Sequence, residues 1–169
     1  MTARFPPLDP WDSGMLPVEE GHEIYWECSG NPQGKPALFL HGGPGGGSSP
    51  GQRRFFDPQL YKIVLFDQRG CGRSRPLAEN PDADLSSNTT SHLIADIEWL
   101  RQFLNVEQWT ILGLSWGTTL GLAYAQKHPR RVNGLVLGLV STTSRSEIDW
   151  ITQGVSRLFP REWDRFSNA

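Results

Sequence analysis

One pentapeptide constrains the fold of this chain more than any other stretch: G-L-S-W-G at residues 113–117. It follows an apolar run at residues 109–112 and precedes an alanine- and leucine-rich stretch at residues 118–125. This order predicts a strand, a tight turn and a helix. The turn needs glycine on both sides of Ser115, because the serine backbone is strained and neighbouring elements approach closely. Such a turn lifts the serine hydroxyl clear of the backbone.

Three glycine-rich or polar segments each follow an apolar run directly. The runs are residues 36–40, 61–66 and 109–112, and the segments that follow them begin at His41, Asp67 and Gly113. Continuous apolar runs of this length are typical of strands buried on both faces of a parallel sheet. Because the carboxyl ends of parallel strands meet at one edge of a sheet, we expect the three segments to converge there and form a site.

The rest of the chain predicts further strands and helices. We expect an extended proline-rich arm over residues 1–17 and a half-exposed strand over residues 22–28, where polar and apolar residues partly alternate. A helix is expected after the T-T-S run at residues 89–91, which is available for capping. The remaining expected elements are a helix ending near Lys127, a fourth parallel strand at residues 132–140 and an amphipathic helical segment at residues 145–166. Together these predict an α/β fold, with a mostly parallel sheet and helices on both faces.

Composition narrows the function classes. The 169 residues fit one domain, and a net charge of -2 gives no electrostatic reason for binding nucleic acid or an anionic membrane. The two cysteines, Cys28 and Cys71, lack metal-ligand spacing and are expected to be reduced thiols. No apolar leader and no membrane-length apolar stretch are present. We therefore expect a cytoplasmic protein without a nucleic-acid or membrane partner.

The converging segments predict part of an acyl-transfer site. Ser115 is the candidate nucleophile, and the backbone N–H of Trp116, the next residue, is one candidate donor for the oxyanion hole. The second donor should come from the loop after an earlier strand. We expect the backbone N–H of Gly43 to serve, because Pro44 has no N–H and a side chain would block the approach of the substrate oxygen.

Each of these residues also has a simpler interpretation. The glycine loop could cradle a phosphate, but no lysine followed by serine or threonine comes after it. Ser115 could be an ordinary turn serine. The charges of Asp67 and Arg69 favour an ion pair or hydrogen-bond bracket between loops over direct chemistry, and Cys71 favours a packed free thiol.

A base for Ser115 is not evident in the sequence. In this type of site the acid and the histidine follow the serine, and only His128 does so. It lies 13 residues on along the predicted helix, which corresponds to about 20 Å. His41 lies within the glycine loop, where an aligned base is not expected. Glu147 and Asp149 follow the fourth strand and are expected to be surface residues at the entrance to a cap. We therefore expect no complete catalytic triad in this chain.

The same segments resemble prolyl iminopeptidases, which are serine aminopeptidases of the α/β-hydrolase fold. The matching stretches are H-G-G-P-G-G at residues 41–46, D-Q-R-G-C-G-R-S at residues 67–74 and G-L-S-W-G-T-T-L at residues 113–120. Leu114 departs from the family, where many members have glycine, but the spacing of the pentapeptide is unchanged. The resemblance covers nearly the whole chain from about residue 10.

The resemblance implies release of an N-terminal proline from peptide substrates, without a metal or an organic cofactor. It also implies that residues 1–140 are the N-terminal part of an α/β-hydrolase core and that residues 141–169 begin a helical cap domain. The catalytic aspartate and histidine of the family would then lie beyond this chain, which would be inactive in isolation. The alternatives are an esterase or epoxide hydrolase on the same fold, or a non-catalytic truncated hydrolase that needs a complementing C-terminal chain.

Overall fold

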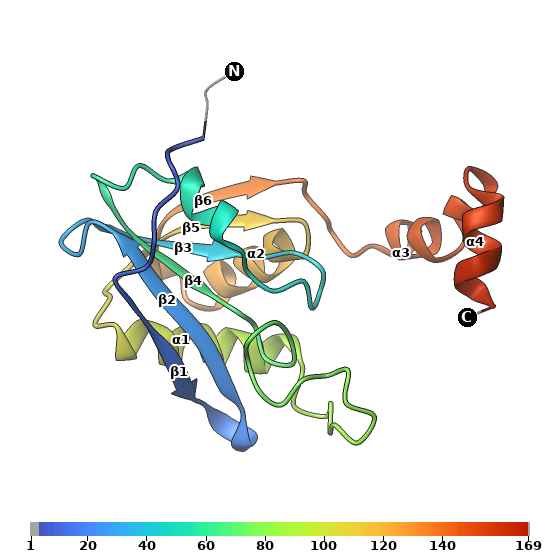
Figure 1. The fold of residues 1–169 in the computed structure, drawn as a ribbon, viewed down its shortest axis with the longest axis horizontal. Coiled ribbons are helices and arrows are strands. Elements are labelled where there is room, and N and C mark those ends of the chain that lie inside the picture. Colours follow the sequence, from blue (N-terminus) through green and yellow to red (C-terminus); the bar gives the residue numbers. More distant parts are fainter. Residues whose placement is uncertain (1–3, 169) are drawn as a thin grey trace.

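The computed structural model describes residues 4–168 and is built on a six-stranded sheet in the order β1-β2-β4-β3-β5-β6 (Figure 1). The strands are β1 (Asp12–Pro17), β2 (Glu23–Gly30), β3 (Lys35–Leu40), β4 (Tyr61–Phe66), β5 (Trp109–Leu114) and β6 (Val132–Gly138). The four strands from β3 to β6 run parallel, while β1 and β2 join antiparallel at one edge. The predicted α/β fold with a mostly parallel sheet is confirmed.

The two long helices pack on one face of the sheet. These are α1 (Thr90–Phe103) and α2 (Trp116–Lys127), and their buried side chains form one core cluster with side chains of β2 to β5. Both connect parallel strands that step in the same direction, from β4 to β5 and from β5 to β6. Right-handed crossovers in one direction place both helices on the same face.

The opposite face carries a smaller core. The crossover from β3 back to β4 steps in the other direction and contains the 3₁₀ helix η2 (Pro50–Phe55). Phe56 packs there with Phe39 and Leu65, and Leu8 of the N-terminal arm adds to the cluster. The expected helices on both faces are therefore realised as two α-helices on one face and a short 3₁₀ segment with the arm on the other.

The N-terminal region differs from the expectation. Residues 12–17 of the expected arm form the edge strand β1, while the first three residues of the arm lie outside the described residues. Because β1 covers its edge, β2 becomes an interior strand, and Trp26, Glu27 and Cys28 are all buried. The strand predicted over residues 22–28 is present as β2, but its predicted half-exposure was wrong for residues 26–28.

The expected side-chain cap of α1 is also absent. Thr89 occupies the N-cap position but makes no side-chain hydrogen bond to the helix backbone. Its hydroxyl instead bonds to Ser91 and to the Nδ1 atom of His92, at 2.9 and 2.8 Å. The Thr89 hydroxyl thus bonds to neighbouring side chains and not to the backbone N–H groups at the start of α1.

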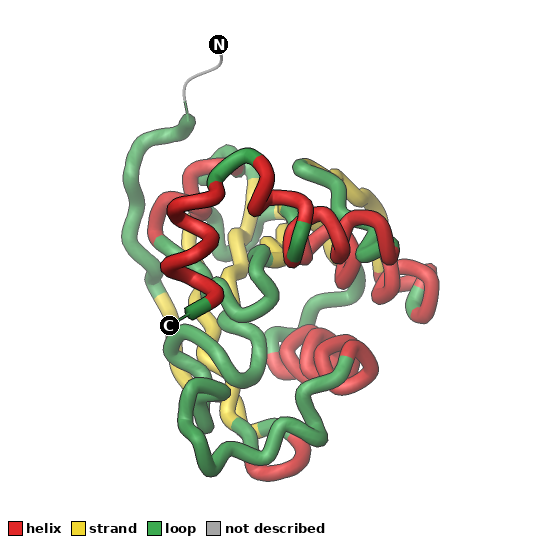
Figure 2. The backbone as a smooth tube through the Cα atoms, turned by 90° about the vertical axis from the view of Figure 1, so that its right-hand side faces the viewer, coloured by secondary structure: helices red, strands yellow, loops and turns green. Residues whose placement is uncertain are grey.

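The C-terminal segment stands apart from the sheet in Figure 1, and Figure 2 views the molecule from the side on which this segment lies. It consists of α3 (Arg145–Thr152), the 3₁₀ helix η4 (Gly154–Arg157) and α4 (Pro160–Ser167), which confirms the expected helical character. The segment begins after β6, whose outer edge has no neighbouring strand among residues 4–168. None of the described helices has the length and apolar character needed to cross a bilayer.

Candidate active site

Ser115 occupies the sharp turn between β5 and α2. Its backbone has φ 55° and ψ −123°, a conformation rarely adopted by a residue with a side chain. Glycine is required on both sides, because a Cβ atom on Gly113 would collide with the carbonyl of Gly117, and one on Gly117 would lie 2.7 Å from the carbonyl carbon of Leu40. The two glycines of this turn are therefore required by close packing within the turn and against β3.

The glycine loop after β3 lies directly beside this serine. The register pairs Leu40 with Gly113, so β3 and β5 end next to each other. A Cβ atom added to Gly42 would lie 3.0 Å from the Cβ atom of Ser115, which only glycine at this position avoids. Gly43 follows with φ +122°, again a conformation that favours glycine.

One cavity brings the predicted site residues together. Ser115, Trp116 and Gly43 all line a cavity of about 290 Å³, together with apolar side chains from α3. The other lining residues are Pro44, Ser141, Thr143, Glu147, Ile148, Ile151 and Thr152. The arrangement places Ser115 and the chain at Gly43 and Trp116 around one space that a carbonyl group could enter.

His41 is bound to its surroundings on both ring nitrogens. Its Nδ1 atom lies 2.9 Å from the carbonyl oxygen of Gly42, and its Nε2 atom accepts the backbone N–H of Gln68 at 3.0 Å. These partners assign the proton to Nδ1. Burial lowers the pKa of His41, although the Gly42 carbonyl and Asp67 act in the opposite direction. The ring is therefore a neutral structural element, as expected, and not a free base.

Asp67 anchors the far end of the glycine loop. Its carboxylate accepts the backbone N–H and the hydroxyl of Ser48, at 2.7 and 2.5 Å, and the Nε–H of Arg73 at 2.8 Å. Burial alone would raise the pKa of Asp67, but the hydrogen bonds from Arg73 and Ser48 outweigh it and lower the pKa. The predicted bracket between loops is confirmed at this residue.

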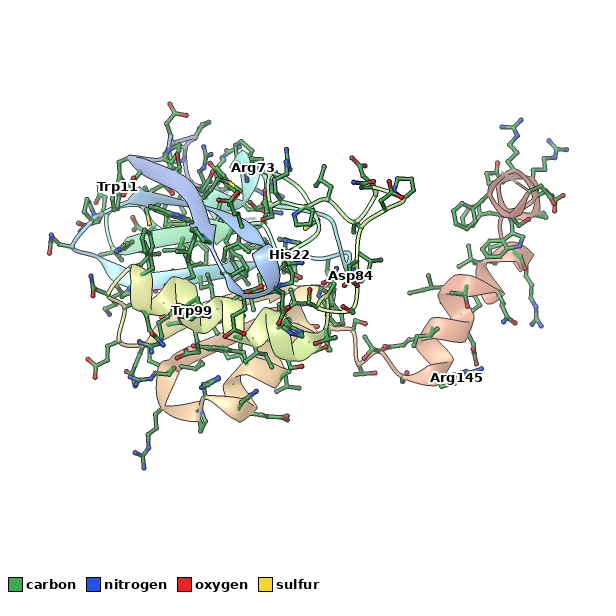
Figure 3. All side chains as sticks on the ribbon, turned by 90° about the horizontal axis from the view of Figure 1, so that it is seen from below. Trp11, His22, Arg73, Asp84, Trp99 and Arg145 are labelled. Atoms are coloured by element: carbon green, nitrogen blue, oxygen red, sulfur yellow. The ribbon has the colours of Figure 1, made fainter. Side chains whose placement is uncertain are left out.

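Arg73 extends the Asp67 bracket to β2. Its guanidinium also contacts Glu27 at 3.2 Å and lies over the ring of Tyr25, 3.7 Å from the ring centroid. Glu27 in turn receives two hydrogen bonds from the buried Arg53 of η2, at 2.6 and 3.0 Å. Figure 3 shows Arg73 on the body of the molecule, close to the sheet.

Arg69 forms a second buried bracket. Its guanidinium donates twice to Asp96 of α1, at 2.7 and 2.6 Å, and once to the carbonyl oxygen of Ser87. Both side chains of the pair are almost fully excluded from solvent. Burial raises the pKa of Asp96, and Arg69 offsets only part of this rise. The pair fixes the polar loop at residues 75–88 against α1, so it supports the site from a distance.

The remaining histidines of the described chain are engaged away from Ser115. His22 bonds to Ser87, His92 to Thr89, and the ring of His128 packs on Tyr124 with centroids 5.2 Å apart. Within residues 4–168, no hydrogen bond joins a histidine to the hydroxyl of Ser115.

The two acidic residues after β6 have separate structural roles. The carboxylate of Glu147 accepts the backbone N–H groups of Thr142 and Ser144, at 2.9 and 3.3 Å. Burial raises the pKa of Glu147, but the hydrogen bonds from this loop together outweigh burial and lower the pKa. Asp149 pairs with Arg145 on the exposed side of α3. Glu147 therefore lines the cavity with one carboxylate oxygen, Oε2, already bound by the loop that enters α3.

Gln68 joins two of the converging segments, a role that the sequence did not indicate. Its side-chain amide donates to the carbonyl oxygen of His41 at 3.1 Å and accepts the indole N–H of Trp116 at 3.1 Å. The only sequence signal was its position directly after a buried strand, within the converging segment that begins at Asp67. Its partners lie 27 and 48 residues away, so the sequence alone could not identify them.

The sequence matches the α/β hydrolase fold family over residues 35–169. It is 54% identical over 162 residues to a probable proline iminopeptidase of Streptomyces coelicolor, covering 96% of this chain and 50% of that protein. The chain thus spans about half the length of this relative.

Solved structures show the same fold. A proline iminopeptidase-related protein from Thermus thermophilus has a TM-score of 0.65 and 32% identity, covering 75% of this chain and 43% of that one. An epoxide hydrolase mutant of Vigna radiata has a TM-score of 0.67 and 26% identity, covering 86% of this chain and 45% of that one. The likeness in fold therefore extends beyond peptidases.

Proposed function

This chain belongs to the α/β hydrolase fold family, and we propose that it supplies the nucleophile and the oxyanion hole of an aminopeptidase that releases N-terminal proline from peptides. The proposal is supported by the sequence identity to the Streptomyces coelicolor relative. One structural observation carries it: Ser115, on its strained turn, shares a single cavity with Gly43 and Trp116.

In the proposed reaction, the Ser115 oxygen attacks the carbonyl carbon of the N-terminal proline. A C–O bond forms, the serine proton passes to a base, and the carbonyl oxygen becomes an oxyanion held by the backbone N–H groups of Gly43 and Trp116. The C–N bond then breaks as the leaving amine takes up a proton. Water hydrolyses the prolyl ester and restores the serine.

We further propose that the acid and the base come from a part of the longer relatives that this chain does not span. The described histidines are all engaged elsewhere, and the relative from Streptomyces coelicolor is twice as long as the matched region. On this proposal, residues 141–169 begin the helical cap, since α3 lines the cavity while standing outside the sheet.

The cavity also supports the proposed substrate. Pro44, Trp116, Ile148 and Ile151 give it an apolar lining that suits a pyrrolidine ring. The buried free thiols of Cys28 and Cys71 are compatible with a reducing compartment, and we propose the cytoplasm.

A chimera tests the proposed function. Residues 1–169 would be joined to the unmatched half of the Streptomyces coelicolor relative and assayed with proline-naphthylamide. We expect turnover that Ser115→Ala abolishes, while the 169-residue chain alone gives only the roughly 10³–10⁴-fold enhancement over water that remains without a complete triad. Efficient turnover by the chain alone would contradict the missing base, and an inactive but folded chimera would contradict the peptidase assignment.

The structural likeness to an epoxide hydrolase keeps a second function open. The same chimera would be offered a nitrophenyl ester and an aryl epoxide beside proline-naphthylamide. A preference for the ester or the epoxide, retained when the proline substrate is in excess, would favour that alternative. We expect the proline substrate to be preferred because of the apolar cavity lining.

The open edge of β6 supports the non-catalytic alternative, in which the chain binds a complementing partner. Val136 of this strand is 57% exposed, and Leu139 and Val140 just beyond it are also exposed. An unpaired strand edge of this kind is prone to pairing with other chains. Size-exclusion chromatography distinguishes the cases, because a monodisperse monomer at high concentration would argue against a partner-seeking edge.

A further inference from the structure

We propose that Gln68 is a positioning residue that fixes the spacing between the two parts of the oxyanion hole, by bridging the glycine loop to the residue after the nucleophile. This inference rests on the proposed function for its catalytic meaning. The bridge itself is a structural claim that can be tested without any substrate.

The bridge uses both ends of one side-chain amide. The Nε2–H of Gln68 donates to the carbonyl oxygen of His41, at the start of the glycine loop that carries Gly43. Its Oε1 atom accepts the indole N–H of Trp116, whose backbone N–H is the other proposed donor. One planar group thus links the two chain segments that must face the same oxyanion.

The partners fix the orientation of this amide. A backbone carbonyl can only accept a hydrogen bond, and an indole nitrogen can only donate one. The Gln68 nitrogen must therefore face His41 and its oxygen must face Trp116. Gln68 is 2% exposed, so water does not compete for either bond.

Backbone contacts hold Gln68 itself in place. Its N–H donates to the Nε2 atom of His41, and its carbonyl oxygen accepts the thiol of Cys71 at 3.1 Å. The titratable groups that face this residue are therefore His41 and Cys71, with the charges of Asp67 and Arg69 on either side along the chain. Because the Gln68 backbone is fixed at the end of β4, its side-chain amide can hold both partners in a fixed position.

Glutamine is the residue type that this geometry requires. Glutamate has nearly the same shape, but an ionised carboxylate cannot donate to the carbonyl oxygen of His41 and would repel it. A protonated carboxyl can donate through its O–H and accept through its carbonyl oxygen. The Gln68→Glu variant is therefore expected to lose the bridge at neutral pH and to recover it in acid.

The consequence for catalysis is geometric. Oxyanion donors act when they lie about 2.7–3.1 Å from the developing charge. A misplacement of about 1 Å can cost on the order of 10²-fold in rate. Gly43 is exposed and belongs to a glycine-rich loop, so its N–H needs an external anchor to hold that geometry.

The test measures backbone order parameters by ¹⁵N relaxation in the free 169-residue chain, at about pH 8 and about pH 5. In the unsubstituted chain we expect the Gly43 amide to be rigid, with an order parameter of about 0.85 at both pH values. In Gln68→Glu we expect it to fall below about 0.6 at the higher pH and to return at the lower pH. Gln102→Glu, the same change at an exposed position of α1, should leave Gly43 unchanged.

Because burial raises the pKa of a carboxyl, Gln68→Glu could stay protonated at about pH 8, so an unchanged Gly43 order parameter in both Gln68→Glu and Trp116→Phe would overturn the bridge. A loss of order in Gln68→Glu that acid does not reverse would also overturn it. If Gln68→Glu does not fold at either pH, Trp116→Phe decides the question, since it removes the indole donor without adding a charge. We expect a partial fall at Gly43 in Trp116→Phe, and no fall there would overturn the bridge. A chimera that fails to hydrolyse proline-naphthylamide would refute the proposed function while leaving this result intact.

Discussion

The sheet body and the C-terminal helical segment are built in opposite ways. In the body, polar side chains such as Asp67, Arg69 and Gln68 are buried, and each is satisfied by partners from other loops or from helices. In the segment from α3 to α4 no residue is fully buried, and large apolar side chains such as Ile151 and Phe166 face solvent. The proposed oxyanion hole therefore belongs to the rigid part, whereas the proposed cap side of the cavity belongs to the weakly held part.

This contrast places a closely packed turn and a weakly packed helix on two sides of one cavity. Ser115 is positioned by strand register and by glycine packing, which leave little freedom. Ile148 and Ile151 reach the same cavity from a helix with few contacts to the body. The comparison predicts large effects for substitutions in the body and small ones for substitutions in the segment.

The largest effect on the free energy of unfolding is expected at the turn that carries Ser115. Gly117→Ala places a Cβ atom against the carbonyl group of Leu40, and neither backbone can move without disrupting β3 or α2. We expect a loss of more than about 5 kcal/mol in the free energy of unfolding, measured by urea denaturation. The control is Gly134→Ala in β6, where the nearest contact would be 3.5 Å, and it should stay within about 1 kcal/mol. Equal losses in the free energy of unfolding for Gly117→Ala and Gly134→Ala would contradict the expectation that close packing makes this turn sensitive.

A matched pair of arginine variants gives the next largest difference. Arg69→Leu leaves Asp96 buried without its partner, so we expect a loss of about 3–5 kcal/mol in urea denaturation. Arg145→Leu breaks an ion pair with Asp149 in which the arginine side chain is 89% exposed, so we expect a change within about 0.5 kcal/mol. A large effect of Arg145→Leu would show that the segment is held more firmly than its contacts indicate.

Acid should destabilise the body through its buried histidines. Burial lowers the pKa of His22 and His41 below the ordinary value of 6.5. The unfolded chain therefore binds more protons than the folded chain below about pH 6.5, and stability falls as the pH drops from there through the lowered pKa values. We expect a slope of up to about 1.4 kcal/mol per pH unit for each histidine, measured from urea midpoints. His22→Asn should remove part of that slope, and an unchanged slope would exclude His22 as a source.

The smallest effect is expected at the end of the segment. Phe166 is 75% exposed on α4, so Phe166→Ser removes little buried apolar surface. We expect the free energy of unfolding to change by less than about 0.5 kcal/mol in urea denaturation. A larger loss would indicate that α4 packs against another surface in solution. The C-terminal segment would then be docked and not weakly held.

The sequence predicted the convergence of the site because periodicity and strand-end rules are local signals. The apolar runs before His41, Asp67 and Gly113 place three segments at one sheet edge without knowledge of side-chain contacts. It also predicted the bracket role of Asp67, since a buried carboxylate needs partners.

Other features depend on contacts that no local pattern encodes. The strand β1 pairs its backbone with β2, although Pro10 precedes it closely and Pro17 is its last residue. The cap at Thr89 failed because Ser91 and His92 compete for its hydroxyl. The partners of Gln68 come from the glycine loop after β3 and from α2, so its bridge is visible only once the fold has brought them together.

The stepwise growth of the sheet has a consequence for synthesis on the ribosome. Strands β5 and β6 are reached by crossovers that run along one face, and β5 pairs with β3, which precedes it in the chain. Because a chain emerges from its N-terminus, the turn that carries Ser115 can form as soon as β5 and α2 have been translated. At that stage the turn is in place, while within residues 4–168 the histidines are bound to partners other than the Ser115 hydroxyl.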